Sequence, residues 1–94
     1  MIKRLVKLNI REEEVDNYIK HFNAHKQKIR AFKGCGHMEM WRHLHEPHVF
    51  FTYSLWKSED ALNNYRHSDL FKGIWSKVKP LFAAKAEAWS VENF

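Results

Sequence analysis

The chain has 94 residues, which is enough for a single domain with one hydrophobic core and too few for two. Aromatic residues make up 15% of it, a generous supply for one small core, so we expect some of them to line a pocket or a subunit interface. The formal net charge is +5, but basic and acidic residues are interleaved and no nucleic-acid-binding motif is present, which argues against a nucleic acid partner.

The sequence also contains no obvious targeting or membrane signal. The N-terminal segment MIKRLVKLNI lacks the apolar stretch of a secretory signal peptide. No segment approaches the ~20 consecutive apolar residues that a membrane span requires. Cys35 is the only cysteine, so no intramolecular disulfide can form, and the chain fits a reducing compartment. We therefore expect a cytoplasmic protein with no membrane partner.

The first third of the chain predicts a strand followed by a helix. Residues 2–10 alternate between apolar and polar side chains, as a half-buried strand does. Acidic residues 12–14 follow, and apolar residues then recur at helical spacing, which predicts a helix that ends near Phe32. The Gly-Cys-Gly sequence at residues 34–36 supplies a turn. We interpret Cys35 in that turn as a structural residue rather than a reactive thiol.

The middle of the chain predicts a β-hairpin. Residues 37–45 alternate again, with Met38 and Met40 on the apolar side and Arg42 as the one exception there. A short polar connection leads to a second β-rich run at residues 49–56. Two neighbouring strands joined by a short loop are typical of an antiparallel pair.

The last third predicts a helix in two pieces and a final strand. Ser58 and Ser68 are both good N-cap residues, and each is followed by acidic and then apolar residues at helical spacing, until Pro80. Alanines alternate with larger residues over residues 84–91, which predicts a strand. The order β-α-β-β-α-β indicates an α+β, ferredoxin-like fold, in which an antiparallel sheet has both helices on one face.

The other face of that sheet needs a cover, because Trp41 and Trp89 lie on it in this scheme. A second copy of the chain is the simplest cover. Two such sheets facing each other would form a barrel-like homodimer with a cavity in each subunit.

One segment resembles a known family. Residues 56–71, WKSEDALNNYRHSDLF, resemble the corresponding part of the antibiotic biosynthesis monooxygenase (ABM) family of dimeric α+β barrels. The exit of the first helix, FKGC at residues 32–35, and the closing strand, KAEAW at residues 85–89, are also similar. The similarity covers nearly the whole chain, so the resemblance implies one ABM-like domain over residues 1–94 and a dimeric α+β barrel.

The family shares a scaffold and performs different reactions. Some members oxidise polycyclic aromatics or quinols with O2 and no cofactor, some degrade heme, some are isomerases and some have no known activity. The heme-degrading members carry a pattern similar to residues 56–71. Where they place a Trp that distorts heme, this chain has Tyr65, and where they place the iron-binding His, it has Trp75. Trp cannot ligate iron and His67 lies at another helical angle, so the sequence argues against that reaction.

A cofactor-free oxygenase holds an electron-rich phenol or anthrone as its anion, in an apolar cavity that supplies a base and donors for the developing charge. The polar candidates for those roles are His43, Tyr65, His67 and Asn9. The candidate cavity walls, which would bind the substrate, are Trp41, Phe51, Trp75 and Trp89. Each has a structural alternative: Tyr65 and Trp75 also fit the apolar helix face, and His67 directly precedes the Ser68 cap.

His43 and His45 suggest a different site. Two His residues at i and i+2 on a strand point the same way and can share a metal ion, with His48 and Glu39 as further ligands. The alternative is that both imidazoles lie at the solvent-exposed end of the hairpin and bind nothing. No second ligand cluster of known spacing accompanies them.

The resemblance and the aromatic supply together favour a small oxidoreductase, a monooxygenase that oxidises a quinol- or anthrone-like aromatic molecule with O2 and without a bound cofactor or metal. The alternative is a non-catalytic dimeric module of the same fold that binds a small hydrophobic ligand. The two differ in turnover, because a binding module shows saturable affinity and forms no product.

Overall fold

The predicted β-α-β-β-α-β order is confirmed. The computed structural model describes all 94 residues. Its second helical segment is divided in two, and short 3-10 turns precede the first helix and follow the last. The elements are β1 (Ile2–Asn9), η1 (Glu12–Glu14), α1 (Val15–Arg30), β2 (Cys35–Arg42), β3 (Val49–Trp56), α2 (Glu59–Arg66), α3 (Asp69–Val78), η2 (Lys79–Leu81) and β4 (Glu87–Val91).

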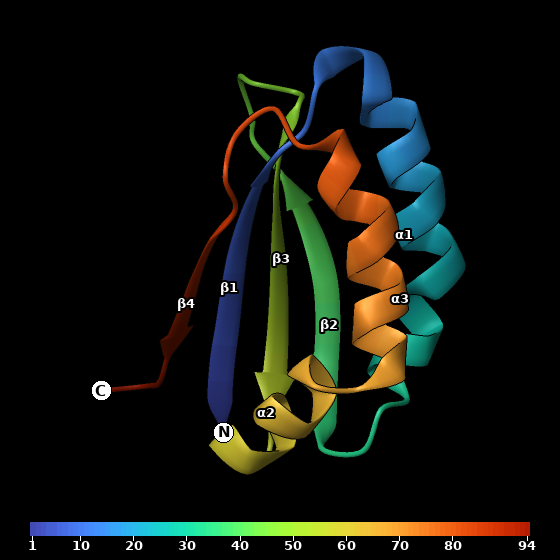
Figure 1. Ribbon diagram of the computed structural model, residues 1–94. Helices are drawn as coiled ribbons and strands as arrows, with labels where there is room; N and C mark the ends of the chain where they lie inside the picture. Colours follow the sequence, from blue (N-terminus) through green and yellow to red (C-terminus); the bar gives the residue numbers. More distant parts are fainter.

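The four strands form one antiparallel sheet in the order β2-β3-β1-β4. All helices lie on the same face of this sheet, so the molecule has two layers (Figure 1). The register places Arg4 of β1 opposite Ser54 on β3 and Ser90 on β4. Because side chains alternate between the two faces, these three residues share the face that the helices cover. We call this the inner face, and the opposite one the outer face.

The first helix ends at Arg30, two residues before the predicted end. Phe32 is past that end, and its ring lies edge-on to both Trp56 and Tyr65, with centroids 6.3 and 5.4 Å apart. The turn that follows requires Gly34, which has a φ of +89°. A side chain there would also place its Cβ 2.5 Å from the Cβ of Ala61. Helix α2 therefore packs against the turn at the position where no side chain intervenes.

The predicted break between two helical pieces is confirmed. The Ser58 hydroxyl accepts a hydrogen bond from the Ala61 backbone N–H at the start of α2, at 3.1 Å. The Ser68 hydroxyl accepts one from the Phe71 N–H at the start of α3, also at 3.1 Å, and donates to the Tyr65 carbonyl at 2.6 Å. Such caps satisfy backbone groups that a helix end leaves unpaired, so Ser68 fixes the angle between α2 and α3.

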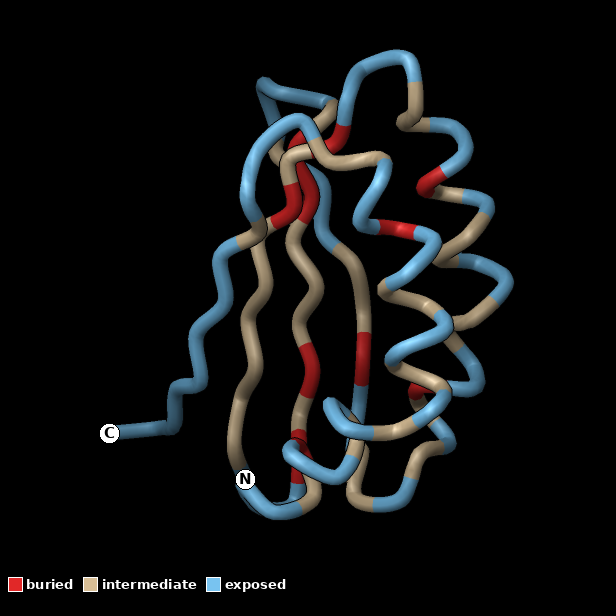
Figure 2. The backbone as a smooth tube through the Cα atoms, viewed as in Figure 1, coloured by how far each residue is buried: buried red, intermediate tan, exposed pale blue.

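The core lies toward the end of the sheet where the hairpin turns, under α1 and the end of α3, and the buried segments of Figure 2 gather there and along β3. Arg42, the exception in the apolar pattern of β2, places its guanidinium over the Phe50 ring at 5.2 Å, an arrangement that lets a charged residue occupy the inner face. The main cluster of buried side chains comprises Leu8, Ile10, Tyr18, Phe50 and Val78.

The last strand is shorter than predicted. It begins at Glu87 rather than at residue 84, and all five of its residues are exposed. The connection before it is held by backbone hydrogen bonds, including one from the Ala83 N–H to the Asn9 carbonyl at 2.8 Å. No helix of the structure has both the length and the apolar character needed to cross a membrane.

The outer face of the sheet carries unburied aromatic residues, as the sequence predicts. Trp41 and Trp89 each remain 45% exposed. Trp41 stacks on Tyr53 with a centroid distance of 5.0 Å, and its direct partner across the β2–β3 pair is Phe51. These four aromatic side chains, together with Leu5 and Val91, define what we call the outer apolar face.

Candidate functional site

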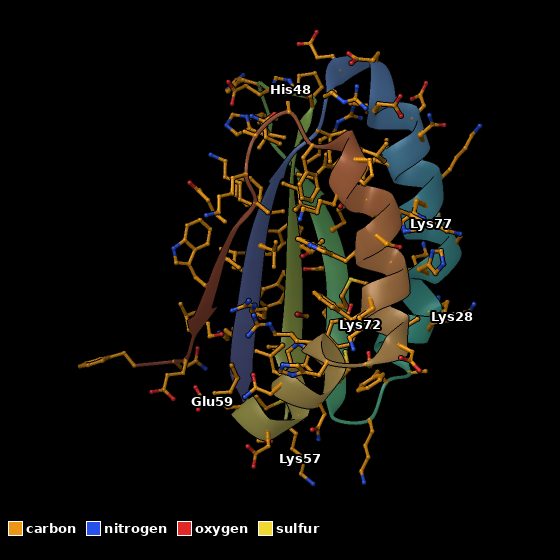
Figure 3. The ribbon with its side chains drawn as sticks, in the orientation of Figure 1. Lys28, His48, Lys57, Glu59, Lys72 and Lys77 are labelled. Atoms are coloured by element: carbon orange, nitrogen blue, oxygen red, sulfur yellow. The ribbon has the colours of Figure 1, made fainter.

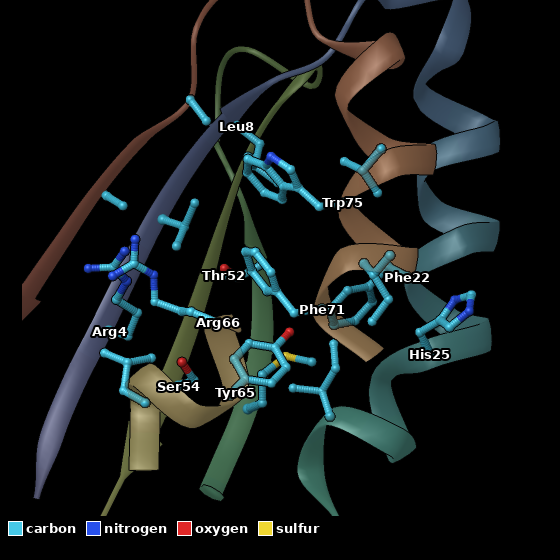
Figure 4. A pocket seen from close by; sticks show the side chains of 18 of the residues that line it. Arg4, Leu8, Phe22, His25, Thr52, Ser54, Tyr65, Arg66, Phe71 and Trp75 are labelled. Atoms are coloured by element: carbon cyan, nitrogen blue, oxygen red, sulfur yellow. The ribbon is translucent and has the colours of Figure 1, made fainter. Parts of the chain in front are cut away.

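A cavity of about 370 Å³ lies between the inner face of the sheet and the helices. Known small-molecule pockets span about 300–1,000 Å³, and a cavity of roughly 150 Å³ already admits benzene, so this one has room for two or three fused rings. Figure 4 shows the side chains that surround it from β1, β3 and all three helices. Most of the lining residues are apolar, 15 of 21 in all.

Aromatic side chains form one continuous wall of the cavity. Tyr65 stacks on Trp56 with centroids 4.9 Å apart, and its other side meets the edge of Phe71 at 5.2 Å. Phe71 in turn stacks on Trp75 at 5.6 Å. The Trp56 indole N–H donates to the Ser54 hydroxyl at 2.9 Å. This hydrogen bond fixes the orientation of the Trp56 ring, which forms one end of the wall. A planar aromatic molecule would find stacking and edge contacts along the whole wall.

Polar side chains interrupt the apolar lining at two separate places. Arg4 and Arg66 lie on the β1 side of the cavity, and His21 and His25 lie on the α1 side. Figure 4 shows Arg4 and Arg66 side by side and His25 across the cavity from them. Thr52 adds a hydroxyl from β3 between the two groups. Each end of a bound molecule would therefore meet different chemistry.

The two histidines form a pair on α1. Their rings are 4.3 Å apart, and His25 Nδ1 lies 2.9 Å from the His21 carbonyl oxygen. His21 Nε2 is buried and has no hydrogen-bond partner. Burial lowers the pKa of His21 from its ordinary value, and the neighbouring His25 and then Lys77 lower it further, while the Ile74 backbone acts in the opposite direction. His21 is thus held as a neutral imidazole, which can accept a proton.

The Tyr65 hydroxyl remains protonated. Burial raises the pKa of this phenol well above its usual range, with a smaller contribution from Cys35. A neutral phenol in an apolar cavity is a hydrogen-bond donor for negative charge that develops on a substrate oxygen. Tyr65 can therefore stabilise an anion but does not supply a base.

Two of the eight sequence-predicted site residues, Tyr65 and Trp75, line this cavity. Both rings also stack within the aromatic wall, so these residues have the packing role on the apolar helix face that the sequence offers as an alternative. The six that lie elsewhere are Asn9, Trp41, Phe51, Trp89, His43 and His67.

Strand parity explains three of the six. Trp41, Phe51 and Trp89 are on odd-numbered positions that face outward, whereas the cavity receives the even-numbered residues of β1 and β3. Asn9 has the same outward parity at the end of β1, where its side-chain oxygen is buried without a hydrogen-bond partner. These four residues are not brought to the cavity, so walls and donors must come from other positions.

The two histidines predicted as catalytic residues are tied into local turns. His67 caps the end of α2, with Nδ1 2.8 Å from the Asn63 carbonyl oxygen. His43 Nδ1 accepts hydrogen bonds from the backbone N–H groups of His45 and Glu46, at 3.1 and 3.0 Å. The latter arrangement closes the hairpin turn and occupies one ring nitrogen of His43. No group of three or more His, Cys, Asp or Glu side chains is positioned to share a metal ion.

Cys35 agrees with its interpretation as a structural residue. Its thiol lies 3.5 Å from the His37 carbonyl oxygen and does not line the cavity. Burial raises the pKa of the thiol, although the His37 backbone and Arg30 act in the opposite direction. A protonated thiol is a poor nucleophile.

The sequence interpretation missed the polar residues that do line the cavity, although a signal for them exists. His25 continues the apolar helical series Tyr18, Phe22 and Ile29, and therefore belongs to the buried side of α1. Arg4 has the same parity as Val6 and Leu8 on β1, which places it on the inner face. A polar residue at a position that continues the apolar series of its helix or strand therefore indicates a side chain on the buried side of that element.

Comparison with known proteins agrees with this architecture. The family model described as "Antibiotic biosynthesis monooxygenase" matches residues 1–75. That range contains β1 to α2 and most of α3, and with them nearly all of the cavity lining. No curated protein sequence matches the chain.

Several solved structures are similar over nearly their full length. A structure described as an antibiotic biosynthesis monooxygenase has a TM-score of 0.94 at 15% identity, covering 100% of this chain and 99% of its own. A conserved protein from Methanosarcina mazei Go1 has a TM-score of 0.93 at 19% identity, covering 99% and 92%. Protein Rv0793 from Mycobacterium tuberculosis has a TM-score of 0.90 at 14% identity, covering 99% and 94%. At these identities the likeness establishes the fold.

Proposed function

Because the chain belongs to the antibiotic biosynthesis monooxygenase family, we propose that it is a small cytoplasmic oxidoreductase that oxidises an electron-rich aromatic molecule with O2 in the cavity beneath its helices. The substrate is quinol- or anthrone-like, and the reaction uses no bound cofactor. The observation that carries this proposal is the cavity itself, an apolar space of about 370 Å³ with one aromatic wall and isolated polar groups.

Such a reaction requires the substrate to supply its own electrons. In an anthrone, the ring CH2 loses a proton to a base, and the resulting anion reduces O2. One oxygen atom enters the ring as C=O, the other leaves as water, and no external reductant is needed. The protein must therefore exclude water, accept a proton and stabilise an oxyanion.

The cavity contains a group for each of these tasks. Its mostly apolar lining disfavours water. His21 is the proposed base, because it lines the cavity and burial favours its neutral imidazole. Tyr65 is the proposed donor to the oxyanion, because its phenol stays protonated. Both residues come from helices that the sheet holds in place.

Oxygen uptake tests the proposal directly. Purified protein, stripped of metal, is mixed with a panel of quinols, naphthols and anthrones in an oxygen electrode, beside enzyme-free samples that measure autoxidation. We expect uptake above autoxidation for at least one substrate, with a matched amount of ketone or quinone product. Saturable binding of the same compounds with no product would instead identify the chain as a binding module of this fold.

We further propose that the protein is a homodimer joined through the outer apolar face. The resemblance to dimeric α+β barrels implies this assembly, and the exposed Trp41 and Trp89 give a reason for it, because large aromatic groups are costly to leave in water. A charged residue introduced on that face would be buried without a partner in the dimer.

The dimer predicts a simple result. Wild-type protein at micromolar concentration should have twice the chain mass of 11.4 kDa by light scattering, and Trp41→Glu should shift it to the single-chain mass. Lys57→Glu, an exposed substitution in the loop before α2, serves as the control and should leave the dimer intact. A wild-type protein that stays monomeric at 100 micromolar would rule the assembly out.

A further inference from the structure

We propose that Arg4 and Arg66 form an anion-binding site at one end of the cavity, and that the ligand is an aromatic carboxylic acid whose rings lie along the aromatic wall. As a statement about substrate class it rests on the proposed function, but as a statement about binding it can be tested without turnover. The geometry that points to it is the position of two arginine side chains next to each other on one side of a mostly apolar cavity.

The two arginines come from different elements. Arg4 is the third residue of β1 and lies on the inner face, where its Nη1 donates to the Ser90 hydroxyl at 3.0 Å. Arg66 is the last residue of α2, and Figure 4 shows its side chain extended toward Arg4. The Ser90 bond uses one donor of Arg4, so most of the ten N–H donors that two guanidinium groups possess remain available.

No carboxylate in the protein neutralises this pair. The ion pairs of the structure involve Arg11 or a histidine, and neither Arg4 nor Arg66 takes part in one. Partial burial lowers the pKa of Arg4, and the positive charge of Arg66 lowers it further. Two like charges that face each other beside an apolar cavity are unfavourable until an anion joins them.

The shape of the site selects the anion. A guanidinium presents a planar fork of donors that matches the two oxygens of a carboxylate. The adjoining wall, from Tyr65 through Phe71 to Trp75, accepts flat rings. A carboxylate attached to a fused aromatic system satisfies both requirements, and it leaves the opposite end of the rings near His21 and His25.

The test compares an acid with a neutral molecule of nearly the same shape. 2-Naphthoate and 2-naphthamide are titrated into the protein by calorimetry under nitrogen, so that no oxidation can occur. We expect naphthoate to bind roughly tenfold or more tightly than the amide, as hydrogen bonds to a charged group would give. We expect this preference to shrink at high salt, because part of it is electrostatic.

Variants assign the preference to the pair. Arg66→Gln, at the exposed end of α2, should weaken naphthoate binding roughly tenfold and change amide binding by less than about twofold. Arg4→Gln should do the same, and retained amide binding would show that the variant is folded. Lys57→Gln removes an equal charge from a side chain that points away from the body of the molecule (Figure 3) and should change neither affinity.

Several outcomes would overturn the inference. Equal affinity for acid and amide, no detectable binding of either, or an acid preference that survives both arginine substitutions would each do so. The result is independent of the oxygenase proposal. If the protein prefers the acid but never consumes oxygen, the anion site is supported and the proposed reaction is rejected. If it oxidises neutral quinols and shows no preference for the acid, the reaction is supported and the anion site is rejected.

Discussion

Replacing Phe50 by Ala should lower the free energy of unfolding by about 3–5 kcal/mol, the usual cost of removing a large aromatic ring from a core. Phe50 is only 1% exposed and lies in the main cluster with Leu8 and Ile10. Its ring centroid is 4.9 Å from that of Tyr18, and the Arg42 guanidinium lies over it at 5.2 Å. The truncation would leave a void and remove the ring over which the Arg42 guanidinium lies. Urea denaturation followed by circular dichroism measures the loss.

The neighbouring residue provides the control. Phe51 is on the same strand and has the same side chain, but it points to the outer face. Phe51→Ala should cost about 1 kcal/mol in the folded chain. Any effect that it has through association would appear as a denaturation midpoint that depends on protein concentration. Equal losses for the two variants, independent of concentration, would contradict the assignment of the faces of β3.

The alternation of side chains along a strand is also one of the local signals that made the fold predictable. Alternation and helical spacing in the sequence are local signals, and they predicted the order of elements, the helix break at Ser68 and the outward direction of Trp41 and Trp89. Element ends were less accurate. The first helix stops at Arg30 because Phe32 turns to pack on Trp56, a contact between residues far apart in sequence that no local pattern reveals.

The site was harder to predict than the fold for a related reason. A cavity forms where the helices and the strands of the sheet fail to fill the space between them, and this depends on the sum of all side-chain volumes. The sequence offers His43 and His67 as polar candidates for the site, yet both close local turns. Arg4 and His25 line the cavity, but a charged or polar residue in a strand or helix gives no local sign that it borders a cavity rather than packed side chains.

His21→Ala should reduce the turnover number for an oxidised substrate by about 100-fold or more, while the KM changes little, because general-base catalysis typically contributes 10²–10⁴-fold. The imidazole accepts the substrate proton only when it is neutral. Its depressed pKa extends the neutral state to lower pH, so turnover by the wild type should rise with pH and reach its plateau below the ordinary histidine value of about 6.5. Oxygen uptake between pH 4.5 and 8 measures this profile.

His67→Gln is the control variant for His21→Ala. The sequence suggests His67 as a catalytic residue, but its side chain does not line the cavity. Its turnover and pH profile should stay within about twofold of the wild type, since removing a group that does not touch the substrate leaves the proton transfer intact. The His21→Ala variant should lose the low-pH limb of the profile and recover part of its rate with added imidazole, because a small base can enter the space that the side chain vacates. If His67→Gln lost the activity and His21→Ala kept it, the base would have to be sought outside this cavity. That outcome would place the reaction at the exposed end of α2, beside His67. Water could be excluded from that position only by a partner subunit.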